Sequence, residues 1–263
     1  MIFTTLRKQL LIGGLILGTA LSGTAMAGEQ LQKIKAAGTL SVGVEGTYPP
    51  FSFQDENGKL TGFEVELSEA LAKQLGVKVK FQPTKWDGIL ASLESKRLDV
   101  VINQVNISEE RKKKYDFSEP YTVSGIQAVV SKKAKETIKT PEDLKGKKVG
   151  MGLGTNYEKW LKENVPQAII KTYDDDPTKY QDLRIGRIDA ILVDRLAAAD
   201  LVNKTNDTLA LAGEPFSREV AGVTLRKGEP ELLAAINQAL EALRADGTLA
   251  KLSNKWFGSD ITR

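Results

Sequence analysis

The chain has 263 residues, of which 41% are hydrophobic and 27% are charged, and it contains neither cysteine nor histidine. This length and composition fit a globular protein with one large domain or two lobes. The absent residue types exclude disulfides, Cys/His metal sites and catalysis by a thiolate or a Ser-His-Asp triad, and we expect no metal and no cofactor. The formal net charge of +3 argues against a nucleic-acid partner, which would demand a strongly basic surface.

The first 27 residues are predicted to be an export signal that is not part of the fold. Arg7 and Lys8 precede an apolar run at 10–21, and Ala25-Met26-Ala27 has the small-x-small pattern that a signal peptidase accepts. The apolar run is too short to span a bilayer comfortably, although an uncleaved N-terminal anchor is the alternative. After cleavage at Ala27 the mature protein would begin at Gly28 with a net charge of +1, because the removed segment holds two basic residues and no acidic one.

Short β-rich apolar runs alternate with helical patterns in the first part of the mature chain. Large apolar residues repeat every four positions from Phe63 to Leu75, which predicts one apolar helix face, and Gly76 is placed to end that helix. The alternation is typical of parallel strands joined by crossover helices. The predicted strands are 40–44, 77–81 and 100–102, and the predicted helices are 63–75 and 86–95.

The same alternation continues in a second unit. Thr140 and Pro141 are suited to the N-cap and first position of a short helix at 140–144. Two units of about a hundred residues fit the usual size of domains, and a ligand should bind between them at strand ends and helix starts. The predicted strands are 126–130, 148–151, 169–173 and 190–193, the further helices are 155–163, 177–185 and 195–202, and two apolar helix stripes end the chain at 233–243 and 249–256.

Polar residues follow the predicted strand at 100–102. Asn103, Gln104 and Asn106 offer donors and acceptors there, and Arg111 stands three residues after the possible N-cap Ser108. An α-amino acid needs such an arginine and backbone N–H groups for its carboxylate. The alternative is a surface loop in which Arg111 belongs to a solvated charged run.

A glycine-rich turn, Gly150-Met151-Gly152-Leu153-Gly154-Thr155, also follows a strand and opens a helix. Its glycines would let backbone N–H groups approach an anion, although an ordinary tight turn is the alternative. The turn lacks the last glycine of a dinucleotide fingerprint and the Gly-Lys-Ser/Thr of a P-loop.

Three further residues are candidates because of their place at the ends of predicted elements. Asp194 ends a very apolar strand, where its carboxylate needs a partner; it could pair with a ligand ammonium or cap the following helix. Tyr48 and Trp86 each fall shortly after a strand, so they could form aromatic walls of a site, although core packing is the alternative for both.

Taken in order, the motifs of the mature chain resemble those of the family-3 bacterial solute-binding proteins. The ordered set is highly specific, although no single motif is. Within the family, the segments 46–53, 85–90, 101–117 and 174–181 are most similar to the cystine-binding member of enteric-type bacteria. The motifs are GTYPPF at 46–51, LTGFEVE at 60–66, WDGIL at 86–90, ISEER at 107–111, YDFS at 115–118, GLGTNY at 152–157, GRIDA at 186–190, ADGTL at 245–249 and WFG at 256–258.

The resemblance implies an α/β fold, the bilobed periplasmic-binding-protein fold of type II, whose two lobes close on a ligand. The chain would cross between the lobes twice, near 123–125 and near 217–220. Residues 28–122 and 220–263 would form the first lobe and residues 125–217 the second. This revises the simpler picture of two successive units, because the C-terminal helices would return to the first lobe.

The resemblance also implies roles for the candidate residues. Tyr48 and Trp86 would flank the ligand side chain, and Gly152 would leave room for a long ligand where relatives often carry a larger residue. Asn103 and Gln104 replace small residues common in relatives, so the hydrogen bonding there stays open. The head group would be bound by Arg111, with Thr155 and the backbone of Asn106 and Asn156, for the α-carboxylate, and by Asp194, with Asn103 or Asn106, for the α-ammonium.

In function, the resemblance implies a monomeric periplasmic protein that binds L-cystine or another polar amino acid without chemistry. It would deliver the ligand to the membrane permease subunits of an ABC importer. Two alternatives are an enzyme on the same scaffold, similar to the cyclohexadienyl and arogenate dehydratases, and a ligand-sensing module that signals to a membrane receptor. No paired acid and base that would favour the enzyme is visible in the sequence.

Overall fold

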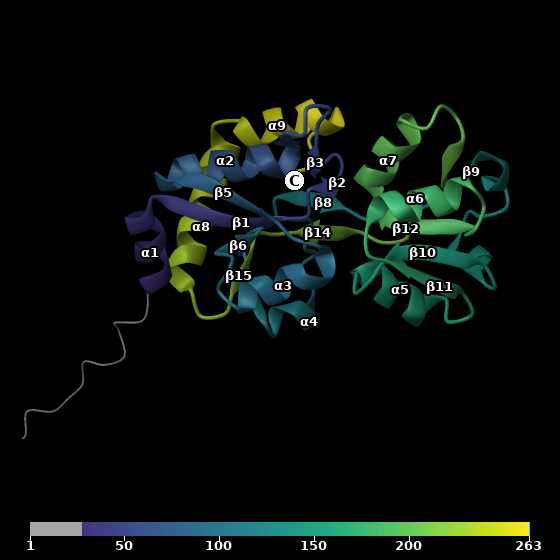
Figure 1. Ribbon diagram of the computed structural model, residues 1–263, viewed down its shortest axis with the longest axis horizontal. Coiled ribbons are helices and arrows are strands. Elements are labelled where there is room, and N and C mark those ends of the chain that lie inside the picture. The colour runs from purple at the N-terminus through teal and green to yellow at the C-terminus, as the bar shows by residue number, and fades with distance from the viewer. Residues whose placement is uncertain (1–27, 263) are drawn as a thin grey trace, which may run out of the picture.

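Two five-stranded sheets organise residues 28–262, the part of the chain that this computed structural model describes (Figure 1). The predicted export signal and its cleavage site lie outside the described residues. The strand order is β5-β1-β6-β15-β7 in the first sheet and β11-β10-β12-β9-β13 in the second. The first sheet contains β1 (Thr39–Val44), β5 (Lys78–Pro83), β6 (Val100–Val101), β7 (Tyr115–Phe117) and β15 (Thr224–Arg226), and the second contains β9 (Ile126–Ser131), β10 (Lys148–Gly152), β11 (Ile169–Tyr173), β12 (Ala190–Asp194) and β13 (Leu209–Ala212).

Both sheets mix parallel and antiparallel strands, which corrects the prediction of parallel strands alone. β1 runs parallel to β5 and β6, and β10 runs parallel to β11 and β12. In the second sheet β9 runs antiparallel to both of its neighbours, β12 and β13. In the first sheet β15 runs antiparallel to both of its neighbours, β6 and β7. β9 and β15 enter their sheets directly from the connection between the two sheets. Because no crossover helix precedes them, they run against their neighbours.

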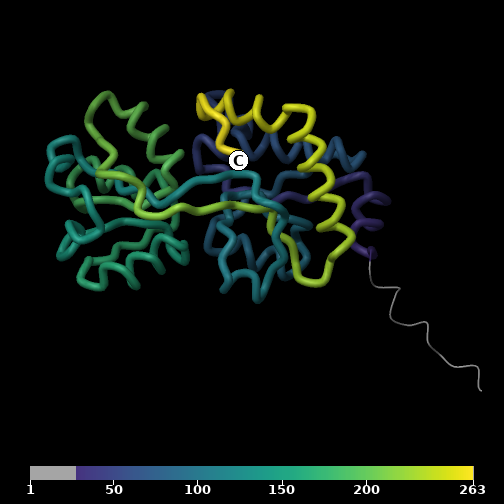
Figure 2. The backbone as a smooth tube through the Cα atoms, turned by 180° about the vertical axis from the view of Figure 1, so that it is seen from behind, coloured from purple at the N-terminus to yellow at the C-terminus, as the bar shows by residue number. Residues whose placement is uncertain are grey.

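Two short strands connect the two halves of the molecule. β8 (Thr122–Ser124) leads into the second sheet, β14 (Glu219–Ala221) leads back, and the two pair in antiparallel register. Figure 2 shows both segments running side by side between the halves. After the return, α8 (Pro230–Ala245) and α9 (Thr248–Phe257) pack against α2 (Phe63–Leu75) beside the first sheet. The molecule therefore has two lobes, and the C-terminal helices belong to the first.

The helix α2 has the bounds that its apolar spacing predicts. Phe63, Leu67 and Leu71 are each at most 1% exposed, so the predicted stripe is buried against the first sheet and the C-terminal helices. Gly76 ends the helix in the left-handed conformation with φ 74°, and its N–H bonds to the carbonyls of Ala72 and Lys73. The spacing therefore predicts the buried face of this helix, and the terminal glycine predicts its end.

Shorter helices, strands and turns complete the described part of the chain. The short helix predicted at 140–144 is instead a 3-10 turn, Pro141–Leu144, held by a capping box of Thr140 and Asp143, because the N–H groups of Asp143 and Lys145 bond to carbonyls three residues back rather than four. The remaining elements are α1 (Glu29–Ala37), β2 (Thr47–Tyr48), β3 (Ser52–Gln54), β4 (Leu60–Thr61), α3 (Trp86–Glu94), α4 (Glu109–Lys112), α5 (Asn156–Asn164), α6 (Asp176–Arg184), α7 (Arg195–Asn203) and a second 3-10 turn at Lys132–Ala134.

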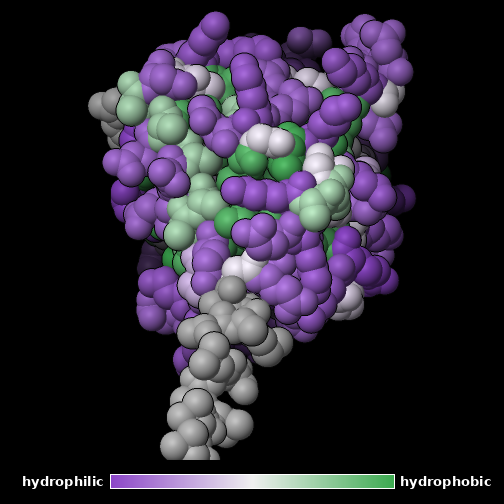
Figure 3. Space-filling model, turned by 90° about the vertical axis from the view of Figure 1, so that its left-hand side faces the viewer, coloured by the Kyte–Doolittle hydropathy of each residue, from purple (hydrophilic) through white to green (hydrophobic). Residues whose placement is uncertain are grey.

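Hydrophilic residues cover much of the end of the first lobe that faces the viewer in Figure 3, with smaller apolar areas between them. Among the helices within residues 28–262, none has the length and apolar character needed to cross a membrane.

Candidate ligand-binding site

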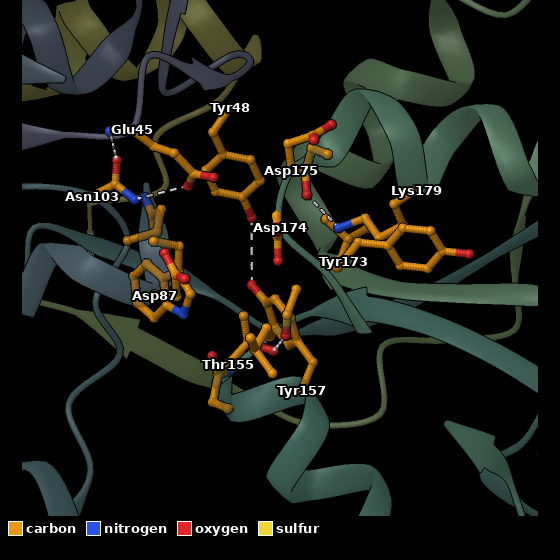
Figure 4. Close-up of a pocket in the computed structure, with 17 residues that line it drawn as sticks. Glu45, Tyr48, Asp87, Asn103, Thr155, Tyr157, Tyr173, Asp174, Asp175 and Lys179 are labelled. Carbon is orange, nitrogen blue, oxygen red and sulfur yellow. Dashed lines mark hydrogen bonds and ion pairs between the residues drawn. The ribbon is translucent and has the colours of Figure 1, made fainter. Parts of the chain in front are cut away.

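A cleft lies where the two lobes meet (Figure 4). Its first-lobe wall comes from β2, from the residues after β1 and β6, and from the start of α3. Its second-lobe wall comes from the ends of β10, β11 and β12 and from the starts of α5 and α6. The space between the walls, including the part open to solvent, is about 580 Å³. Strand ends and helix starts of this kind are where open α/β sheets usually bind ligands.

The structure brings most of the predicted site residues to this cleft. Arg111 and Asn106 line a neighbouring hollow, which shares two residues with the cleft. Asp194 lines neither of these two spaces, although Val193 before it lines the cleft. The predicted residues that line the cleft are Tyr48, Trp86, Asn103, Gln104, Gly152, Thr155 and Asn156, and the two shared with the hollow are Thr155 and Asn156.

The glycine-rich turn shapes the second-lobe wall at the start of α5. Thr155 is the N-cap of this helix: its hydroxyl accepts a hydrogen bond from the N–H of Glu158 and donates one to the carbonyl of Gly152 at 2.8 Å. A Cβ on Gly152 would lie 3.0 Å from the methyl carbon of Thr155, so the turn is tight there. The amide of Asn156 donates to the carboxylate of Glu219 at 2.5 Å. The start of α5 is thus tied to β14, one of the strands that connect the lobes.

Gln104 is held in place by a buried carboxyl group. Its backbone is left-handed, with φ 47°, and its N–H donates to Oε1 of Glu64 at 2.6 Å. Tyr121 donates its hydroxyl to the same oxygen at 2.5 Å, and burial raises the pKa of Glu64 to about 8. The side-chain oxygen of Gln104 accepts from Thr122, but its buried Nε2 has no acceptor among residues 28–262. Gln104 therefore presents an unused donor in a residue that lines the cleft.

Arg111 is positioned by the local structure that the sequence predicts. Ser108 is the N-cap of α4 and accepts a hydrogen bond from the N–H of Arg111 at 3.2 Å. The Nη1 of Arg111 donates to the carbonyl of Asn106 at 3.3 Å and to its side-chain oxygen, and the guanidinium carbon lies 5.3 Å from the centre of the Trp86 ring. Burial lowers the pKa of Arg111, while the nearby charge of Glu219 opposes that change. The guanidinium is thus half-buried between the hollow and an aromatic wall of the cleft.

Asp194 caps α7, as one of the two interpretations of the sequence requires. Its Oδ1 accepts a hydrogen bond from the N–H of Leu196 at 2.8 Å, and the side chain is 5% exposed. Burial raises its pKa to about 6, although the backbone N–H groups of Leu196 and Ala197 limit the rise. The carboxyl group is therefore mostly ionised at neutral pH, and its cap does not exclude a second partner.

Side chains of the two lobes contact each other across the cleft. The hydroxyl groups of Tyr48 and Tyr157, which come from opposite lobes, lie 3.5 Å apart. Lys85 and Asp174 approach to 4.0 Å across the same junction, and Glu110 pairs with Lys159. These groups would separate if the lobes moved apart.

Charged residues of the second lobe lie near Glu45 in the cleft, and Glu45, Asp176 and Lys179 are here called the charged end; Asp175 also acts on Glu45. The ammonium of Lys179, 2% exposed, lies 2.5 Å from Oδ1 of Asp176, whose other oxygen accepts from the hydroxyl of Tyr180 at 2.5 Å. Burial raises the pKa of Glu45 to about 7, and the negative charge of Asp176 adds to the rise. Asn103 accepts from the N–H of Glu45 at 2.7 Å and donates to its carboxylate at 3.4 Å. The side chain of Asn103 is therefore already engaged in orienting Glu45.

Several residues that line the cleft were not predicted from the sequence, notably Glu45, Tyr157, Asp174–Asp176 and Lys179. The acidic residues carried a usable signal, because Glu45 follows β1 and Asp174 follows β11, and both strands lie in the parallel part of a sheet. Lys179 carried none, since a lysine in a predicted helix normally faces solvent.

Known proteins share both the sequence and the fold. The family of bacterial extracellular solute-binding proteins, family 3, matches residues 40–259. The L-cystine-binding protein TcyJ of Escherichia coli (strain K12) is 69% identical over 233 residues, which cover 89% of this chain and 88% of the relative. The L-cystine-binding protein TcyA of Bacillus subtilis (strain 168) is 40% identical over 90% of this chain and 87% of the relative. The crystal structure of the ancestral amino acid-binding protein AncCDT-1, a precursor of cyclohexadienyl dehydratase, has a TM-score of 0.83 and 42% identity, and the match covers 87% of this chain and 100% of that chain.

The match extends over most of the chain, and the bilobed architecture with a cleft between the lobes agrees with it. The chain therefore belongs to the bacterial extracellular solute-binding proteins, family 3, and has their α/β bilobed type II fold.

Proposed function

We propose that this protein captures L-cystine in the periplasm and delivers it to the permease subunits of an ABC importer. The observation that carries the proposal is the 69% identity, over 89% of the chain, to a protein that binds L-cystine. The cleft supports it, because its walls combine aromatic, acidic and amide side chains suited to an amino acid. The predicted export signal supports the location. We infer that the protein acts as a monomer.

Arg111 is proposed to bind the α-carboxylate of the ligand. Only its Nη1 has acceptors among the residues 28–262, so the other guanidinium N–H groups can bind a carboxylate. Thr155 and Asn156 line both the hollow of Arg111 and the cleft, and they would complete this position. The ligand carboxylate would then sit beside Trp86, above which the guanidinium already lies.

Asp194 is proposed to bind the α-ammonium while it caps α7. The side-chain oxygens of Asn106 and Asn103 already accept from Arg111 and from the N–H of Glu45, and the second lone pair of either oxygen can accept from the ammonium. Tyr48 and Trp86 would flank the disulfide-linked side chain, and Gly152 would leave room for its length. Burying an ammonium without a carboxylate would be very costly, which supports an acidic partner at this strand end.

We infer that residues 28–122 with 220–263 and residues 125–217 are the two lobes that move. The separate sheets and the two-stranded connection of β8 and β14 support this division. A ligand that touches both lobes in the closed form and only one in the open form shifts the population toward closure. The contacts between Tyr48 and Tyr157 and between Lys85 and Asp174 would form in that step.

An enzyme on the same scaffold is the second candidate, because AncCDT-1 is a dehydratase precursor. Catalysis would need a general acid that reaches the ligand. Glu64 is fully buried and does not line the cleft, whereas Glu45 lines it and has a pKa of about 7. Incubation with prephenate and arogenate tests this candidate. Turnover of either compound that is lost in Glu45→Gln would support an enzyme and refute a function in binding alone.

Calorimetric titration of the refolded, ligand-free mature protein tests the proposed function. We expect tight one-to-one binding of L-cystine and far weaker binding of L-cysteine, glutamine, histidine and arginine. Tight binding of another amino acid would keep the class of protein and refute the choice of cystine. If none of these amino acids binds, the proposal as a whole is wrong.

A further inference from the structure

Lys179 is a buried cation whose hydrogen-bonding capacity is mostly unused. Its ammonium lies 2.5 Å from one oxygen of Asp176 and 5.2 Å from the centre of the Tyr180 ring. An ammonium has three N–H donors, and Lys179 has no second acceptor among the residues 28–262. Buried donors without an acceptor are costly, so this arrangement is suited to receiving an acceptor from the cleft that Lys179 lines.

Glu45 supplies the opposite charge from the first lobe. Figure 4 shows Glu45 and Lys179 entering the cleft from opposite walls. They are close enough for the positive charge of Lys179 to counteract the rise in the pKa of Glu45. One carboxylate oxygen of Glu45 accepts only a long hydrogen bond, 3.4 Å, from Asn103, so the carboxylate can accept from a cation. A donor and an acceptor thus lie at the charged end in different lobes, where both can hold one ligand only when the lobes close.

The charged end is distinct from the position proposed for the α-carboxylate. Arg111 and Asn106 line the neighbouring hollow, whereas Glu45 and Lys179 line only the cleft. Figure 4 shows Thr155, which lines both spaces, well apart from Lys179. A ligand that spans both positions must therefore carry a polar group at each end.

We propose that Lys179 binds the carboxylate of a second head group while Glu45 binds its ammonium, so that the cleft selects an amino acid with a zwitterion at both ends. This inference rests on the proposed function and names the residues that recognise the far half of cystine. A guanidinium in the same place could pair with Glu45 but would offer Lys179 no acceptor, which disfavours arginine.

The test compares two ligands and three proteins by calorimetry. L-cystine has two head groups, and S-methyl-L-cysteine has one head group and a neutral end. In Lys179→Met we expect the affinity for L-cystine to fall about 10- to 150-fold, the range for a lost hydrogen bond to a charged group. The affinity for S-methyl-L-cysteine should change by less than about threefold, because that ligand does not reach Lys179. Lys171→Met, at an exposed position on β11, is the matched control and should leave both affinities unchanged.

Two further variants keep the test decisive if Lys179→Met folds poorly. Lys179→Met combined with Asp176→Asn removes both charges of the buried pair and should show the same selective loss of L-cystine binding. Lys179→Arg keeps the positive charge and should recover most of the affinity for L-cystine. If Lys179 served only to neutralise Asp176, the double variant, which removes both charges, would instead keep the affinity for L-cystine.

The outcomes separate the inference from the function on which it rests. Selective loss of L-cystine binding supports the inference. Wild-type binding of L-cystine that persists unchanged in the Lys179 variants, or an equal loss for both ligands, overturns the inference and leaves the proposed function standing. If the wild-type protein binds neither ligand, the proposed function fails and the inference falls with it.

Discussion

The affinity for cystine should depend on pH through Glu45. In the closed cleft without ligand its pKa is about 7, chiefly because of burial and then because of the charge of Asp176 on the opposite lobe. A ligand ammonium bound to the carboxylate would favour the ionised form and return the pKa toward its ordinary value of about 4.5. Binding must therefore displace a proton from a growing fraction of the molecules as the pH falls below 7. The affinity is lost toward low pH, and is fully present above pH 7.

The size of the effect follows from these two pKa values. Between pH 7.5 and pH 6.0 the dissociation constant should rise by up to about eightfold through Glu45 alone, and the full rise applies when the ligand-free cleft is closed as in this structure. Asp194, whose pKa is about 6, adds about a twofold loss over the same interval if it binds the α-ammonium. Glu45→Gln cannot take up the proton, so it should bind less tightly at pH 7.5 and retain only the twofold dependence.

Calorimetry at pH 7.5 and 6.0, at constant ionic strength, measures the dissociation constants directly. Repeating the titration at pH 7.0 in two buffers with different ionisation enthalpies counts the released protons, and we expect about half a proton per ligand from Glu45. S-methyl-L-cysteine lacks the second ammonium and should show only the weaker dependence. An eightfold loss that persists in Glu45→Gln, or that appears equally with S-methyl-L-cysteine, would refute the assignment of Glu45.

Three further predictions concern single residues. Arg111→Met should weaken cystine binding about 100-fold or more, because it removes the proposed partner of a buried carboxylate, and it should not lower the melting temperature appreciably. Lys113→Met, at an exposed position, is the control. Wild-type affinity in Arg111→Met would contradict the role of Arg111. Asp194→Asn should keep the cap of α7, since asparagine is an equally good N-cap, but it should lose affinity for cystine. A lower melting temperature with unchanged affinity would show that Asp194 serves only as a helix cap. Glu64 has a folded-state pKa of about 8, above its ordinary value of about 4.5, so the folded protein binds the extra proton and the free energy of unfolding should fall as the pH rises between these values. In urea unfolding, Glu64→Gln should flatten that decline, and an identical slope would show that Glu64 does not cause it.

Elements with strong local signals were predictable from the sequence. The four-residue spacing of α2 with its terminal glycine, and the Ser108 cap three residues before Arg111, depend on neighbouring residues alone, and the structure has both. The fold class followed from the order of many weak motifs, and the family match confirms it. These features do not depend on how the two lobes meet.

The features that were missed depend on contacts between distant segments. β7 and β15 have three residues each, too few for an alternating pattern, and they pair across about a hundred residues of sequence. Lys179 lies in an ordinary helical segment, and it lines the cleft because the second lobe faces the first. Glu45 could have been found, because it directly follows a parallel strand, the criterion that selected Asn103 and Asp194.

The place of β15 has a consequence for the order in which the molecule can be assembled. All strands of the second sheet come from the continuous stretch 126–212, so the ribosome has made that sheet's full complement before the chain returns. The first sheet began earlier in the sequence, yet β15, between β6 and β7, and the helices α8 and α9 are made last. The early strands of the first sheet can pair with β15 only after about a hundred further residues have been made, and pairing between such distant segments forms slowly. The inserted lobe can therefore assemble first, and a chain that stops before residue 224 lacks the strand that completes the lobe carrying Arg111.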